Sequence, residues 1–145
     1  RLSDPANGNV KPTARAQACQ QITQAMMAHP EMVGGPGRFD TRLMEVTQGK
    51  LFSKGGAEGY QGIGIMPNVL GENSPGIGIA IKISDGDLKG RAINAISLEV
   101  LRQLQVLTTG ELETLAEFGP KVFLRNFRNF TVGVAQPRLN LAWNK

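Results

Sequence analysis

Two short segments of the chain alternate between bulky and small residues. In residues 59–66, Gly62 and Gly64 alternate with Ile63 and Ile65. Residues 75–83 do the same with isoleucine at every second position and glycine, alanine or lysine between. Successive side chains of a strand point to opposite faces, so each segment is predicted to be a strand with one bulky and one small face. The turn-forming residues 68–74 between them predict an antiparallel hairpin.

A third short strand, over residues 51–54, is expected just before a glycine-rich turn. That turn spans residues 54–59 and reads Lys-Gly-Gly-Ala-Glu-Gly. Glycine lets other groups approach the backbone closely. Backbone N–H groups in such a turn can point at an anion or a carbonyl oxygen. We therefore expect residues 54–59, called here the glycine turn, to form the edge of an active site.

The rest of the pattern is mostly helical. Residues 90–107 predict the strongest helix, and we expect it to lie across the small-residue face of the hairpin, where glycine lets another backbone come close. Shorter helices are predicted over 41–46, capped by Asp40, and over 111–118. A further helix over 13–29 should pack one face on the core, through Ala14, Ala18, Cys19, Ile22, Ala25, Met26 and His29. The fold class is therefore α+β, with an antiparallel sheet of about three strands packed against helices.

Length and composition indicate one modest domain. With 145 residues, 41% of them hydrophobic, the chain can bury a core. We assign residues 13–145 to a single domain and residues 1–12 to a polar linker or cut end. No run approaches the roughly 18 apolar residues of a membrane span, so no membrane partner is expected. The lone cysteine suits a reducing compartment, which predicts a cytoplasmic protein.

Metal binding is not expected within this chain. Cys19 and His29 share the predicted stripe of the first helix, and they are the only cysteine and histidine in the sequence. They could be a nucleophile or metal pair, or a core thiol with a histidine at a helix end. Because a zinc site needs three or four ligands, we favour the second interpretation.

Basic and aromatic residues mix in residues 121–130. This composition permits stacking on single-stranded nucleic acid. Alternatively, Phe123, Phe127 and Phe130 lie four and three residues apart, so one helical turn could dock them into the core. We favour the core interpretation, because the lysine and the two arginines of this segment are too few for a nucleic-acid groove.

Read together, several segments resemble the C-terminal half of the asparaginase II proteins. The resemblance is carried by His29-Pro30-Glu31-Met32-Val33, Gly37-Arg38, Asp40-Thr41, Lys54-Gly55-Gly56-Ala57-Glu58-Gly59 and Gly78-Ile79-Ala80-Ile81-Lys82-Ile83. It implies a serine β-lactamase/glutaminase-like fold. It also implies an amidohydrolase that converts L-asparagine to aspartate and ammonia.

The resemblance also implies roles for the glycine turn. Family chemistry uses a serine nucleophile in a Ser-x-x-Lys motif, and a second lysine in a Lys-Thr/Ser-Gly-like motif on an edge strand. Lys54-Gly55-Gly56 matches the second motif, with glycine in place of the hydroxyl residue. Lys54 would then be catalytic and would hold the α-carboxylate of asparagine. Substrate or oxyanion contacts would come from Gly55, Gly56, Ala57 and Glu58, with the Ala57 N–H as an oxyanion donor.

No Ser-x-x-Lys occurs in the 145 residues. The resemblance places that motif, and the cysteines that bind zinc in some members, upstream. We therefore expect a C-terminal portion that is completed by the N-terminal half of the same protein, and that is inactive alone. The family sheet has five strands, so the strand near 77–83 should expose an edge. This edge would pair with another chain, including a second copy in a homo-oligomer, or be covered by a last strand near Val132. The alternative is a non-catalytic module of amidohydrolase ancestry that binds amino acids or a partner protein.

Overall fold

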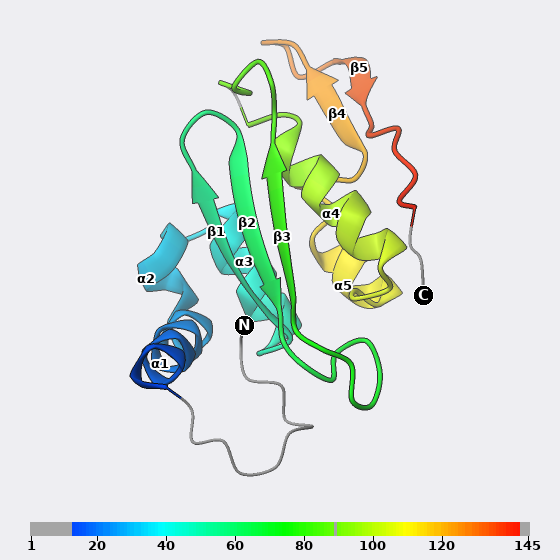
Figure 1. Cartoon of the computed structure of the whole chain (residues 1–145). Helices are drawn as coiled ribbons and strands as arrows, with labels where there is room; N and C mark the ends of the chain where they lie inside the picture. The colour runs from blue at the N-terminus through cyan, green and yellow to red at the C-terminus, as the bar shows by residue number, and fades with distance from the viewer. Residues whose placement is uncertain (1–12, 89, 143–145) are drawn as a thin grey trace.

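A computed structural model describes residues 13–88 and 90–142 of the chain, which form helices and two antiparallel sheets (Figure 1). The predicted α+β class is confirmed. The proposed linker 1–12 lies outside the described residues. The elements are α1 (Ala14–Ala28), α2 (Pro30–Gly34), α3 (Phe39–Thr47), β1 (Leu51–Gly56), β2 (Tyr60–Ile65), β3 (Ile77–Lys82), α4 (Ile93–Gln103), α5 (Thr109–Thr114), β4 (Val122–Arg125) and β5 (Thr131–Ala135).

The first sheet is antiparallel, with the strand order β1-β2-β3. Strands β2 and β3 lie where the alternation predicted them, and β1 lies where a short strand was expected before the glycine turn. Lys54 pairs with Gly62, and Ser53 with Ile63, while Gly62 pairs in turn with Ala80. Because register fixes which side chains share a face, this pairing puts Ser53, Gln61, Ile63 and Ile65 on one side of the sheet.

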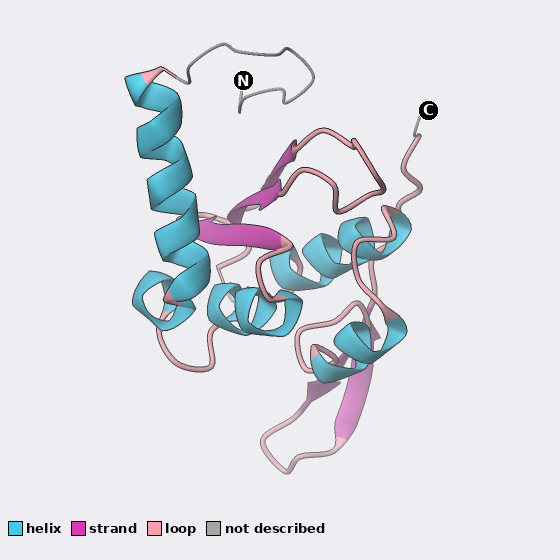
Figure 2. Ribbon diagram, turned by 90° about the horizontal axis from the view of Figure 1, so that it is seen from below, coloured by secondary structure: helices cyan, strands magenta, loops and turns pink. Residues whose placement is uncertain are grey.

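The core lies on that bulky side of the sheet. Helices α3 and α4 cross this face, whereas the opposite face is turned towards the viewer in Figure 1 and is seen nearly edge-on in Figure 2. The buried cluster that joins the helices to the sheet consists of Phe39, Leu43, Met44, Leu51, Ile63, Ile65, Leu98, Leu101, Val106, Leu107 and Leu115.

The expectation that the helix over 90–107 lies across the small-residue face is wrong. Helix α4 packs on the isoleucine face, because that face offers the larger apolar area to bury. On the small-residue face, the rings of Phe52 and Tyr60 lie over the glycines. A Cβ on Gly64 would overlap the Phe52 ring, and one on Gly62 would lie 3.2 Å from the Tyr60 hydroxyl. The glycines therefore make room for side chains of their own sheet.

Helix α1 forms as predicted but does not bury its apolar stripe. Thr13 caps its N-terminus, and Thr23 is its one buried residue. Ile22 is 60% exposed, and Cys19 is exposed too, so the interpretation of Cys19 as a core thiol is wrong. Helix α1 packs mainly against α2 and β1, so most of its apolar stripe stays outside the core. No helix of the described residues is long and apolar enough to span a membrane.

The two shorter helices differ from prediction at their starts. Helix α3 begins at Phe39, so Asp40 lies inside its first turn and does not cap it. Helix α5 begins earlier than residue 111, because Thr108 and Glu111 form a capping box. Glu111 also accepts hydrogen bonds from Lys50 Nζ at 2.8 and 2.9 Å, which ties α5 to the start of β1.

Residues 121–130 are not a helical turn, and their phenylalanines do not enter the core. Residues 122–125 form β4, which pairs with β5 in a separate two-stranded sheet. Phe123, Phe127 and Phe130 are all exposed. The predicted last strand near Val132 is β5, but it does not cover β3. Among the described strands, none pairs with the outer edge of β3.

Candidate functional site

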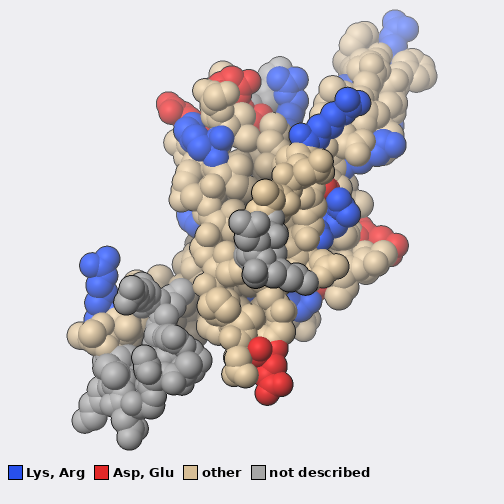
Figure 3. All heavy atoms as spheres, turned by 45° about the vertical axis from the view of Figure 1, so that its right-hand side comes forward, with Lys and Arg blue, Asp and Glu red and all other residues tan. Residues whose placement is uncertain are grey.

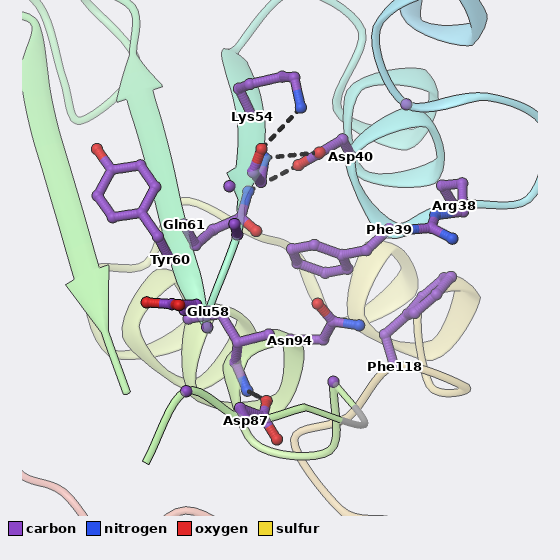
Figure 4. Close-up of a pocket in the computed structure, with 18 of the residues that line it drawn as sticks. Arg38, Phe39, Asp40, Lys54, Glu58, Tyr60, Gln61, Asp87, Asn94 and Phe118 are labelled. Atoms are coloured by element: carbon purple, nitrogen blue, oxygen red, sulfur yellow. Dashed lines mark hydrogen bonds between the residues drawn. The ribbon is translucent and has the colours of Figure 1, made fainter. Parts of the chain in front are cut away.

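The glycine turn borders a large cavity. The cavity measures about 940 Å³, and it opens between the β1–β2 turn, the N-terminal ends of α3 and α4, and the loop after β3 (Figure 4). The charged residues that line it are of both signs: Arg38 and Lys54 are cations, whereas Asp40, Glu58 and Asp87 are acids. Phe39 and Phe118 form an apolar wall, with ring centres 5.4 Å apart.

Asp40 connects α3 to both strands of the β1–β2 hairpin. Its carboxylate is almost fully buried and accepts three hydrogen bonds, each 2.7 Å long. The donors are the Ser53 hydroxyl, the Gly55 N–H and the Gln61 side-chain amide. Gln61 also donates to Ser53 Oγ at 2.7 Å. Because buried donors are costly to leave unpaired, this network fixes the start of the glycine turn against α3.

The same network removes Ser53 from consideration as a nucleophile. Its side chain is fully buried, and its hydroxyl donates to Asp40 while accepting from Gln61. A nucleophilic serine needs an accessible hydroxyl beside a base.

The far end of the glycine turn is held by β3. The Gly59 carbonyl accepts the Ile83 N–H at 2.9 Å, and the Lys82 ammonium donates to the Glu58 carbonyl. Gly59 has a φ of +65°, and a Cβ there would lie 3.1 Å from the Asp87 Cβ. Only glycine fits this position easily. The turn is therefore fixed at both ends, as a preorganised donor group requires.

Lys54 lies two residues before the end of β1, with its side chain exposed. Its ammonium donates to the neighbouring Gly55 carbonyl at 2.7 Å, and Figure 4 shows it folded back over the strand end. Among the described residues, no carboxylate lies within ion-pair distance of Lys54. The cavity rim thus carries a cation whose charge is not matched by an acid.

Asp87 closes the cavity on the side of α4. Its carboxylate accepts the N–H groups of Arg91, Ala92 and Ile93 at 2.8 to 2.9 Å, so it caps the helix. Partial burial acts to raise the pKa of Asp87. The three backbone N–H groups and the charge of Arg91 together outweigh that effect, so the pKa lies below its usual value.

The cavity brings together the predicted site residues Lys54, Gly55, Gly56, Ala57 and Glu58. The Gly55 N–H is already donated to Asp40, whereas no described residue accepts a hydrogen bond from the Ala57 N–H. Sequence reasoning missed Asp87, Asn94 and the role of Asp40. One signal was present for the Asp40 network, because Ser53 and Gln61 are polar residues at inward positions of apolar strands.

Cys19 lies on α1 and His29 follows its last residue, and neither lines the cavity. In residues 13–88 and 90–142, no three His, Cys, Asp or Glu side chains gather closely enough to hold a metal ion.

Comparison with known proteins agrees with the resemblance seen in the motifs. The model of the family "L-asparaginase II" matches residues 1–137, which is most of the chain. No curated protein matches the sequence. The chain belongs to the L-asparaginase II family, and the family indicates an amidohydrolase-type function.

Proposed function

We propose that this member of the L-asparaginase II family provides the lysine-bearing rim of an active site that hydrolyses L-asparagine to aspartate and ammonia. The observation that carries the proposal is the unmatched cation of Lys54, placed next to a turn that is fixed at both ends. A free cation beside backbone N–H groups favours a bound carboxylate and a developing oxyanion.

The charges of the cavity suit an amino-acid substrate. Free asparagine carries both an ammonium and a carboxylate, and the cavity wall contains both cations and acids. We assign the α-carboxylate to Lys54, whose present acceptor is a neutral carbonyl that an anion would readily replace. The Ala57 N–H would stabilise the oxyanion, since the Gly55 N–H is already used by Asp40.

The nucleophile would come from a Ser-x-x-Lys motif outside these residues, on the N-terminal half of the same protein. Ser53 is the serine nearest in sequence to the turn, and it is buried and doubly hydrogen-bonded. The outer edge of β3 is the proposed contact with that half, because an unpaired edge readily accepts another strand. A second copy of the chain is the alternative occupant of this edge.

The test is the exchange of Lys54 for alanine in the protein that carries both halves of the site. We expect kcat/KM for asparagine, measured by ammonia release, to fall by about 100- to 1,000-fold, as for the loss of one preorganised electrostatic contact. Lys121→Ala removes an equally charged side chain that does not line the cavity, and it serves as the matched control. A Lys54→Ala variant with wild-type kcat/KM would exclude the assignment.

A second measurement tests the location of the nucleophile. The 145-residue chain alone should release no ammonia from asparagine. Ammonia release by this chain would mean that the nucleophile lies within it. Calorimetric binding of asparagine without turnover, in the protein with both halves, would instead favour the non-catalytic amino-acid-binding alternative.

A further inference from the structure

The β4–β5 hairpin (residues 122–135) gathers several large apolar side chains on the described surface. It carries five large apolar side chains that are between 46% and 93% exposed: Phe123, Phe127, Phe130, Val132 and Val134. Monomeric proteins rarely leave such side chains together in water without a binding role. None of the five lines the cavity at the glycine turn.

The register of the hairpin explains why these residues are exposed. Phe123 lies directly opposite Val134, and Leu124 lies opposite Gly133. Leu124 and Ala135 point inward and line a cavity of about 250 Å³ beside α4. Phe123 and Val134 therefore share the outward face, which nothing in the described structure covers.

Charge accompanies this apolar face. Residues 119–142 include Lys121, Arg125, Arg128 and Arg138 and contain no acidic residue. Lys121 Nζ lies 5.3 Å from the centre of the Phe123 ring, and Arg128 Cζ lies 5.6 Å from that of Phe127. Figure 3 shows the hairpin projecting at the upper right, with blue and tan atoms on the projecting part.

We propose that the β4–β5 hairpin docks the protein on an anionic phospholipid surface, with its phenylalanines entering the interface and its cations contacting the head groups. Each Lys or Arg near such a surface attracts it, and apolar side chains bury area in the acyl boundary. Long cationic side chains next to aromatic rings can keep their charge in the head-group layer while their stems lie along apolar groups.

Two other occupants fit the same face less well. A second copy of the chain, placed face to face, would set Arg125, Arg128 and the adjacent Lys121 of one copy against those of the other, which costs free energy. Single-stranded nucleic acid binds by stacking in a charged groove. This face is a projection, and two of its five apolar residues are valines, which offer no ring for stacking.

Sedimentation of the 145-residue chain with vesicles tests the proposal. We expect binding to vesicles of phosphatidylcholine and phosphatidylserine, weakened by salt, and little binding to phosphatidylcholine alone. The variant Phe127→Ser/Phe130→Ser should bind about tenfold more weakly, because it removes two exposed rings. Lys121→Gln/Arg128→Gln removes two cations and should bind about thirtyfold more weakly.

The matched control removes one apolar and one cationic side chain from another exposed surface. Arg15→Gln/Ile22→Ser changes α1 and should leave vesicle binding unchanged, with the circular dichroism of all variants equal. The proposal is wrong if no vesicle binding occurs at low salt, or if the control loses as much binding as the hairpin variants. It is also wrong if a single-stranded oligonucleotide competes with the vesicles and its own binding needs the same four hairpin residues.

Discussion

The β1–β2 hairpin and the β4–β5 hairpin have the same topology but opposite environments. Helix α3 packs on the first, and Asp40 and the Lys50–Glu111 ion pair connect it to helices on its inner side. The second has a bulge between Leu124 and Arg125 and faces water with its largest side chains. Both hairpins contain phenylalanine together with valine or isoleucine, so composition alone does not decide whether these side chains are buried.

What separates the two hairpins is the presence of a partner surface. The first offers an isoleucine face to two helices, and it orders a turn that lines the cavity. The packing of the first hairpin therefore holds Lys54 and Ala57 in fixed positions. The second contributes little to the core, so its exposed residues are free to serve binding. Three substitutions test this contrast.

Loss of Asp40 should have the largest effect on the first hairpin. Asp40→Ala would leave the Ser53 hydroxyl, the Gly55 N–H and the Gln61 amide without their acceptor in a buried site. We expect the free energy of unfolding to fall by about 3 kcal/mol. Urea denaturation followed by circular dichroism measures it.

Two comparisons accompany that measurement. Asp40→Asn keeps the shape and one acceptor, so it should lose less stability than the alanine variant. Glu72→Ala removes an exposed carboxyl from the loop before β3 and should change the stability by less than about 0.5 kcal/mol. Equal loss in Asp40→Ala and Glu72→Ala would show that the network does not support the hairpin.

Loss of the carboxylate that caps α4 should have a smaller effect, and this effect depends on pH. The pKa of Asp87 is lower in the folded chain than in the unfolded one, so its contribution is complete above the unfolded pKa of about 4. It is lost as the pH falls through the folded pKa. We expect Asp87→Ala to cost about 1 kcal/mol at pH 7, as for other lost caps, and progressively less below pH 4. A difference between wild type and variant that is constant from pH 7 to pH 2 would contradict this cause.

Sequence reasoning predicted β2 and β3 because bulky and small residues alternate along them with the period of a strand. It failed at the second hairpin because Phe123, Phe127 and Phe130 have the spacing of a helix, and short apolar runs do not distinguish a helix from a strand. It placed α4 on the wrong face because glycine spacing does not reveal that Phe52 fills the space. The Asp40 network joins residues 40, 53, 55 and 61, and such pairing depends on the packing of α3, which no local pattern records.

The smallest effect is expected at Phe127, whose side chain is 93% exposed. Phe127→Ala removes a ring that buries almost nothing, so the free energy of unfolding should change by less than about 0.5 kcal/mol. Phe52→Ala is its counterpart in the first hairpin, and it should cost about 2 kcal/mol, because the Phe52 ring is partly buried over Gly64. If the two substitutions cost the same, the second hairpin is packed in solution, and its phenylalanines are no longer free to bind a surface.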